Sequence, residues 1–195
     1  MFRYIVIFFL LCALVFTPVL GDYCPDTDYM LIMMEAVCDS DEAAGREAER
    51  LRDEKIAALG LEYEKISFDE LSLLSKIIEA EAGSLWLSME WKMAVGEVVL
   101  NRVASPEFPD SIKAVIEQPG QYYGAGSYYL ASLKPSAESV EAAKRLLEGE
   151  RVLCDPSVVF QANFPQGSSV HTLLYDSMLG YTYLCCSNYP EYYGG

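Results

Sequence analysis

Apolar residues follow a helical period between residues 67 and 82. Ser67 precedes Glu70 by three positions, the capping-box spacing at which the two side chains satisfy free N–H groups at a helix start. Gly83 follows the periodic stretch and predicts the helix end. At about 100° per residue, four apolar residues share one face: Leu71, Leu74, Ile77 and Ile78. The pattern predicts a capped amphipathic helix.

One carboxylate, Glu81, projects into the middle of this apolar stripe, whereas Glu79 lies roughly opposite. Glu81 also falls in the last turn, near the negative end of the helix dipole. Burial and the dipole both raise the pKa of a carboxyl. A carboxyl that stays protonated near neutral pH can act as the general acid of glycoside cleavage. Helix ends also carry solvated charges without a role, and helical geometry alone leaves that alternative open.

The rest of the chain predicts more helices and then a few strands. Helical patterns recur over residues 89–103, 111–118 and 136–149. A tyrosine-rich loop is expected between the last two of these helices. The later pattern is extended, with β-rich runs over residues 157–164, 171–175 and 180–186. We therefore expect an α+β domain over residues 67–187, mainly helical with a small antiparallel sheet, followed by a flexible tail over residues 188–195.

The N-terminal part differs from this domain in composition. Arg3 precedes a continuous apolar run, the pattern of a secretory signal peptide over residues 1–21. An uncleaved membrane anchor is the alternative. Either reading places the functional part outside the cytoplasm, secreted or associated with the cell wall. Residues 22–66 alternate acidic and basic side chains and predict a charged helical spacer.

Charge and residue inventory argue against several classes of function. The net charge of −15, or −16 without the first 21 residues, argues against nucleic acid as a partner. No phosphate-binding glycine loop, dinucleotide fingerprint or HExxH motif occurs, so no cofactor is expected. His171 is the single histidine and no CxxC pair exists, which argues against a metal site and against cysteine-protease chemistry. A disulfide between Cys24 and Cys38 is compatible with export, but the pairing stays open.

The number of candidate carboxylates bears on the reaction. Ordinary glycosidases need two carboxylates. No pattern distinguishes a second one here among Glu90, Glu97 and Asp110. A lytic transglycosylase needs one acid/base group, because the substrate's own 6-hydroxyl attacks the anomeric centre. One distinguished glutamate favours that reaction.

Several runs carry a family resemblance: EAEAG, MAVGEVVLNRVASPEFPDSIKAVIEQPGQY, KPSAESVEAAKRLL and VVFQANFPQG. Together they resemble the catalytic domain of the cell wall hydrolase family typified by germination spore cortex-lytic enzymes, over residues 68–186. The resemblance implies a lysozyme-like domain that cuts the glycan strands of peptidoglycan, with Glu81 as the acid/base. It also directs attention to Gln121 and Gln161 as groove residues.

Aromatic residues complete the predicted substrate-binding set. Tyrosines present flat faces with polar tips, which suit stacking on sugar rings, although each one can equally pack its loop on the core. The predicted substrate-binding residues are Trp86, Gln121, Tyr122, Tyr123 and Gln161.

The sequence thus predicts a secreted peptidoglycan hydrolase that cleaves the bond between N-acetylmuramic acid and N-acetylglucosamine as a lytic transglycosylase. It is expected to be a monomer with no stable membrane partner. The chain departs from its relatives in two respects. Leu85 in EAGSL stands where EARGE of many relatives has a second glutamate, and the loop to the second helix is about two residues longer than in the spore enzymes. The alternatives are a wall-binding protein without activity, or a muramidase or amidase acting on peptidoglycan.

Overall fold

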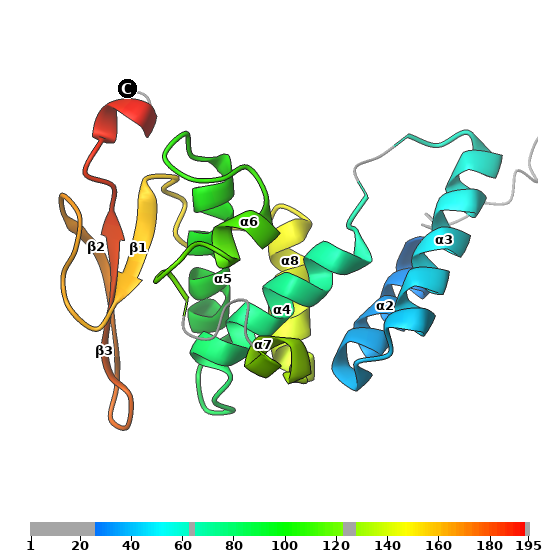
Figure 1. Cartoon of the computed structure of the whole chain (residues 1–195), viewed down its shortest axis with the longest axis horizontal. Helices are drawn as coiled ribbons and strands as arrows, with labels where there is room; N and C mark the ends of the chain where they lie inside the picture. Colours follow the sequence, from blue (N-terminus) through cyan, green and yellow to red (C-terminus); the bar gives the residue numbers. More distant parts are fainter. Residues whose placement is uncertain (1–25, 63–64, 123–127, 194–195) are drawn as a thin grey trace, which may run out of the picture.

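The structure is a computed structural model that describes residues 26–62, 65–122 and 128–193. The predicted signal peptide, Cys24 and Tyr123 lie outside the described residues. Helices come first in the chain and strands last (Figure 1). The elements are α2 (Asp26–Asp39), α3 (Glu42–Leu59), α4 (Phe68–Ala82), α5 (Met89–Ala104), α6 (Ile112–Ile116), α7 (Tyr128–Ser132), α8 (Ala137–Leu147), β1 (Val158–Ala162), β2 (Val170–Asp176), β3 (Gly180–Cys186) and the 3-10 helix η1 (Pro190–Tyr193). The predicted α+β class, mainly helical with a small antiparallel sheet, is confirmed.

Helix α4 begins at Ser67 as predicted. The Glu70 backbone N–H donates to Ser67 Oγ at 3.1 Å, while the Ser67 hydroxyl donates to the Glu70 carboxylate at 2.8 Å. In a capping box the Glu70 carboxylate would accept from the Ser67 backbone N–H. Here it accepts from the Ser67 hydroxyl instead, so the second bond joins the two side chains. The helix ends at Gly83, which keeps a right-handed conformation.

The helical layer packs around α4, α5 and α8. The apolar stripe of α4 is fully buried, as the periodicity predicts. Gly96 of α5 allows its neighbours to approach closely, because a Cβ there would lie 2.5 Å from Leu146 Cδ1 and 2.7 Å from Ile78 Cδ1. A side chain at position 96 would separate the three helices. Residues 128–132 form the short helix α7 within the segment expected to be a loop.

The segment expected to be a solvated spacer instead contributes to the core. Helices α2 and α3 lie side by side (Figure 1), and Met33, Val37 and Ala48 belong to the same buried cluster as α4 and α8. The Arg52 side chain is fully buried and its Nη1 donates to the Ile66 carbonyl at 2.6 Å. The charged helix α3 has few apolar residues, but α2 has buried methionines that pack into the core. Residues 26–59 therefore form a packed helical hairpin.

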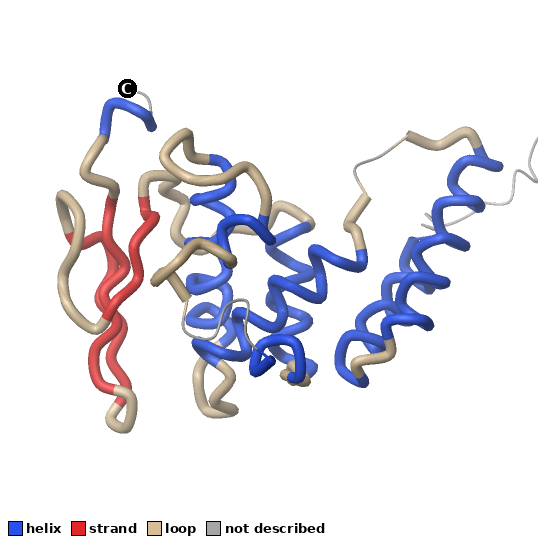
Figure 2. Tube along the Cα trace, viewed as in Figure 1, coloured by secondary structure: helices blue, strands red, loops and turns tan. Residues whose placement is uncertain are grey.

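The three strands form an antiparallel sheet in the order β1-β3-β2, drawn in red in Figure 2. One face packs on α5, since Leu184 of β3 shares a buried cluster with Ala94 and Val98. The sheet is thus anchored to the helical layer through α5.

No helix in the described part of the chain has the length and apolarity needed to cross a bilayer.

The C-terminal segment is held to the domain at η1, unlike the flexible tail expected from the sequence. The Tyr193 hydroxyl lies 2.6 Å from Ser105 Oγ and donates to the Glu107 carboxylate at 2.7 Å. The Ser187 hydroxyl also bonds Glu107. These contacts connect η1 to the loop that follows α5.

Candidate active site

Glu81 lies in the last turn of α4 and is only partly exposed. Burial raises the pKa of this carboxyl, and the nearby positive charge of Arg102 opposes the rise without cancelling it. The direction is the one predicted from the sequence. Within the described residues, no hydrogen-bond donor engages the Glu81 carboxylate, so nothing there stabilises its charged form except Arg102.

Arg102 reaches this site from the last turn of α5. Its side chain is 4% exposed, and its Nε donates to the Val159 carbonyl of β1 at 2.6 Å. The guanidinium carbon lies 5.1 Å from the centre of the Phe108 ring and 5.2 Å from that of Tyr122. Two aromatic faces and one carbonyl therefore hold the cation in place.

One nitrogen of this guanidinium remains available. Arg102 Nη1 is buried and has no hydrogen-bond partner in the described part of the chain. A buried donor without a partner is costly in a folded protein and is often satisfied by water or a ligand. Arg102 can thus offer one charged N–H to an oxygen atom near Glu81.

Tyr122 completes a cluster that we call the Glu81 cluster, consisting of Glu81, Arg102 and Tyr122. Burial raises the pKa of the Tyr122 hydroxyl, the Arg102 charge lowers it, and the Glu81 charge raises it. The Arg102 charge therefore acts on both Glu81 and Tyr122, and the Glu81 charge acts on Tyr122. The ring of Tyr122 is partly packed against the core, so the packing alternative considered for the loop tyrosines also holds for part of its surface.

Gln161 lies on the strand that Arg102 contacts. It is paired with Leu184 in the β1-β3 register, which places it on the sheet face toward α5. Its Oε1 is buried without a hydrogen-bond partner among the described residues. Of the sequence-predicted residues, Tyr122 thus packs against the Arg102 guanidinium, and Gln161 lies two residues beyond Val159, whose carbonyl accepts from Arg102.

The other predicted substrate-binding residues lie farther out. Trp86 is 57% exposed in the turn after α4, and its side chain is among the hydrogen-bonding groups that lower the pKa of Asp176 at the end of β2. Gln121 is exposed, and its backbone N–H donates to the Gln118 carbonyl at 3.3 Å. Within the described structure, no hydrogen bond or ion pair joins the side chain of either residue to Glu81 or Arg102.

Arg102 was not among the predicted site residues. Arg102 and its neighbour Asn101 are polar residues that directly follow an apolar run in a helix. Polar residues in such a position are often buried for a specific purpose, and this pattern could have identified both. Asn101 Nδ2 donates to the carbonyls of Asp155 and Val158, each at 3.0 Å. Asn101 therefore fixes β1 to α5. Arg102 is bonded to the same strand, and its charge also acts on Glu81.

The carboxylates considered as second catalytic groups have other surroundings. Glu97 is fully buried and accepts from three backbone N–H groups, those of Val152 at 2.6 Å, Leu153 at 2.9 Å and Cys154 at 3.1 Å. Its carboxylate holds the segment leading to β1 in place. Glu90 and Asp110 are exposed to solvent. The described residues also hold no group of three or more His, Cys, Asp or Glu side chains able to bind a metal ion.

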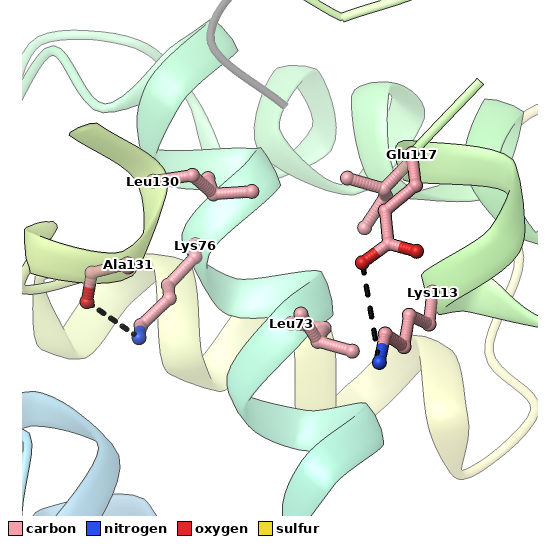
Figure 3. A pocket seen from close by; sticks show the side chains of 7 residues that line it. Leu73, Lys76, Lys113, Glu117, Leu130 and Ala131 are labelled. Atoms are coloured by element: carbon pink, nitrogen blue, oxygen red, sulfur yellow. Dashed lines mark hydrogen bonds and ion pairs between the residues drawn. The ribbon is translucent and has the colours of Figure 1, made fainter. Parts of the chain in front are cut away.

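A pocket of about 230 Å³ lies on another side of α4, between α6 and α7 (Figure 3). Its two lysines are engaged, because Lys76 Nζ donates to the Ala131 carbonyl at 3.2 Å and Lys113 Nζ lies 4.0 Å from a Glu117 oxygen. Glu81 does not line this pocket. The pocket is therefore separate from the Glu81 cluster.

Comparison with known proteins agrees with the family resemblance. Residues 88–170 match the model of a family described as Cell Wall Hydrolase, a segment that contains Arg102, Tyr122 and Gln161 and begins beyond Glu81. The resemblance to this family is confirmed, and the match supports a cell wall hydrolase without identifying the bond that is cleaved. A solved structure, the catalytic domain of the Bacillus cereus SleB protein, aligns with a TM-score of 0.47 and 21% identity over 63% of this chain and 94% of that chain. No curated protein matches the chain.

Proposed function

We propose that this chain, which matches the cell wall hydrolase family over residues 88–170, cleaves peptidoglycan between N-acetylmuramic acid and N-acetylglucosamine as a lytic transglycosylase. The observation that carries the proposal is Glu81, a carboxyl whose pKa is raised by burial and which faces the charge of the buried Arg102. Glu81 is the catalytic residue in this proposal. Tyr122 and Gln161 are the groups that bind sugar.

The reaction requires one group to give and then accept a proton. Protonated Glu81 donates its proton to the glycosidic oxygen as the bond to the anomeric carbon breaks. The resulting carboxylate then accepts the proton of the muramyl 6-hydroxyl, whose oxygen bonds to the anomeric carbon and leaves a 1,6-anhydro end. Proton transfer by a positioned group typically accelerates such a reaction by about 10²- to 10⁴-fold.

Arg102 suits both halves of this cycle. Burial favours the protonated form of the Glu81 carboxyl, whereas the guanidinium charge favours the carboxylate that remains after proton donation. The free Arg102 Nη1 can donate to a substrate oxygen in the same place. Arg102 thus acts as a positioning residue that balances the two protonation states.

The surrounding carboxylates support a mechanism with one acidic group. Glu79 and Glu97 both accept several hydrogen bonds from neighbouring segments and are committed to the fold. Leu85, which stands where relatives have a second glutamate, is 74% exposed. An intramolecular nucleophile from the substrate needs no second carboxylate, in contrast to water-dependent hydrolysis.

The substitution Glu81→Gln tests the assignment. It keeps the side chain's size and removes the titratable proton, so release of muropeptides from purified peptidoglycan should be abolished while circular dichroism stays unchanged. Glu90→Gln, at an exposed glutamate, is the matched control and should release muropeptides at the wild-type rate. A folded Glu81→Gln protein with wild-type activity would show that another residue is the acid/base.

Mass spectrometry of the wild-type digest identifies the bond and the product end. Anhydro ends are expected for the proposed transglycosylase. Hydrated reducing ends would instead indicate a muramidase, and free stem peptides an amidase.

The exposed Leu85 also favours a second candidate, a protein that binds the wall without cleaving it. Such a protein would sediment with purified sacculi and cause no loss of turbidity. The predicted export to the cell exterior is part of the proposal, because peptidoglycan is an extracytoplasmic polymer.

A further inference from the structure

The sheet has a second face, away from α5, that carries aromatic side chains. In the β2-β3 register Leu173 lies opposite Tyr183, and Tyr175 lies opposite Tyr181. Opposite partners share a face, and residues two apart along a strand do as well. Their neighbour Leu184 points toward the helices, so these four point outward. We call them the tyrosine face: Leu173, Tyr175, Tyr181 and Tyr183.

The tyrosine face is open to solvent over much of its area. Tyr175 is 61% exposed, and Tyr181 and Leu173 are each 50% exposed. The rings form a row, with centroids 4.8 Å apart between Tyr175 and Tyr181 and 6.2 Å apart between Tyr181 and Tyr183. In Figure 1 strands β2 and β3 lie at the end of the molecule opposite the α2-α3 hairpin, and no helix of the described residues covers their outer side. A contiguous exposed aromatic patch of this kind marks an interaction surface.

The chemistry of this face indicates a neutral, hydroxyl-rich partner. Asp176 is the only Asp, Glu, Lys or Arg between residues 170 and 186. It is engaged elsewhere, because its carboxylate accepts from the backbone N–H groups of Met178 and Leu179 and from the Trp86 indole. A face without charged side chains offers no attraction to a polyanion or a basic protein. Tyrosine rings stack on the apolar faces of sugars, while their hydroxyls form hydrogen bonds.

We propose that the tyrosine face binds the sugar backbone of the wall glycan at a site separate from Glu81. This inference rests on the proposed function, which supplies the polymer. Gln161 and Arg102 lie on the helix side of the sheet and the tyrosine face lies on the other, so the two sites engage different stretches of glycan. Because the chain carries a net charge of −15, long-range attraction does not hold it on an acidic wall. A second contact raises the local concentration of glycan at the active site.

The experiment compares two double substitutions of exposed tyrosines. Tyr175→Ala with Tyr181→Ala removes the centre of the tyrosine face. Tyr189→Ala with Tyr192→Ala is the matched control, because these two rings on and beside η1 are 50% and 53% exposed and lie 5.6 Å apart. Both pairs are placed in the Glu81→Gln background so that the polymer stays intact. The probe is purified glycan strands from which the stem peptides have been removed, and binding is measured by co-sedimentation.

The proposal expects the Tyr175 and Tyr181 pair to weaken binding by about fivefold or more, with the control pair unchanged. In otherwise wild-type enzyme the same Tyr175 and Tyr181 pair should cleave short soluble glycans at the normal rate. Equal binding by the two double variants overturns the proposal. The proposal is also overturned if the protein binds intact peptidoglycan but not the peptide-free strands. It is overturned as well if the wild-type protein is a dimer and the Tyr175 and Tyr181 double variant is a monomer that still binds glycan.

Failure of the proposed function gives a different result. A wild-type protein that releases no muropeptides, yet sediments through Tyr175 and Tyr181, binds glycan without cleaving it. An active wild-type enzyme whose sedimentation ignores these tyrosines cleaves glycan without this second site.

Discussion

Glu79 and Glu81 stand two residues apart near the end of α4 and have opposite surroundings. One oxygen of Glu79 accepts from the Ser136 N–H at 2.9 Å, the Ser136 hydroxyl at 2.7 Å and the Ser139 hydroxyl at 2.7 Å. These bonds outweigh desolvation and lower the pKa of Glu79, whereas desolvation of Glu81 raises its pKa. Both carboxylates are partly buried. The comparison shows that the donors around a carboxylate, and not its burial alone, decide whether it supports the fold or titrates in a site.

Of the substitutions that test the difference between Glu79 and Glu81, the one with the largest expected effect removes the catalytic carboxyl. Glu81→Gln should lower muropeptide release by about 10²-fold or more, since it removes the proton that Glu81 transfers. Glu79→Gln should leave the reaction rate per folded molecule within a few-fold of wild type. Initial rates normalised to folded protein would test both. Similar losses in the two variants would mean that the two glutamates do not have separate roles.

A substitution of Arg102 should shift the pH dependence of activity. Arg102→Met removes the charge that lowers the pKa of Glu81, so the pH at which Glu81 ionises should move upward. Arg102→Lys retains the positive charge and is the control, with a smaller shift. The measurement is the pH profile of kcat/KM, which reports ionisations of the free enzyme. An unchanged profile in a folded Arg102→Met protein would show that Arg102 does not act on Glu81.

Loss of the Glu79 carboxylate should reduce stability. Glu79→Gln replaces a charged acceptor by a neutral amide at the start of α8, where a negative charge also favours the helix dipole. We expect the free energy of unfolding to fall by about 1–2 kcal/mol. Urea denaturation at neutral pH measures this change. Glu70→Gln in the first turn of α4 is the comparison variant, because it also removes a negative charge from a helix start, whereas among the described residues its carboxylate accepts only the exposed Ser67 hydroxyl; its loss of stability should be smaller.

The smallest expected effect is on the pH dependence of stability, which should change in opposite directions in Glu79→Gln and Glu81→Gln. The lowered pKa of Glu79 contributes stability above its unfolded value near 4.5, and this contribution is lost as pH falls through the folded pKa. The raised pKa of Glu81 has the reverse sign, because its buried charge reduces stability as pH rises from about 4.5 through the folded pKa. Glu81→Gln should therefore be slightly more stable than wild type at neutral pH. Denaturation midpoints at pH 4 and pH 7 would detect a reversed sign.

The tyrosines illustrate what periodicity could and could not predict. The pattern from residue 171 to residue 186 predicted strands, and the alternation of exposed and covered residues in β2 agrees with it. The sequence nevertheless predicted sugar binding by tyrosines of the 121–134 loop, because flat tyrosine faces with polar tips suit stacking on sugar rings. Only the register between β2 and β3 shows that Tyr175, Tyr181 and Tyr183 form one row. Strand pairing between distant residues carries information that local patterning does not.

The N-terminal helices show a related limit. Dense charge in α3 predicted a solvated spacer, but this pattern described α3 in isolation. Once α2 pairs with α3, Met33 and Val37 reach the core beneath α4 and α8. Burial of Arg52 follows from the same pairing, since its guanidinium can then reach the Ile66 carbonyl.

The sequence by itself determined the helix from Ser67 to Gly83, its apolar stripe and the choice of Glu81 over Glu79 as the residue on that stripe, because caps and helical period depend on neighbours a few residues apart. The tertiary structure decided the rest of the site. Arg102, Tyr122 and Gln161 come from segments that local pattern cannot bring together, and the effect of Arg102 on Glu81 depends on the packing of α5 against β1. Electrostatic coupling and burial are properties of the folded arrangement, which is why the pKa of Glu81 could be anticipated in direction while Arg102, the charge that opposes it, could not.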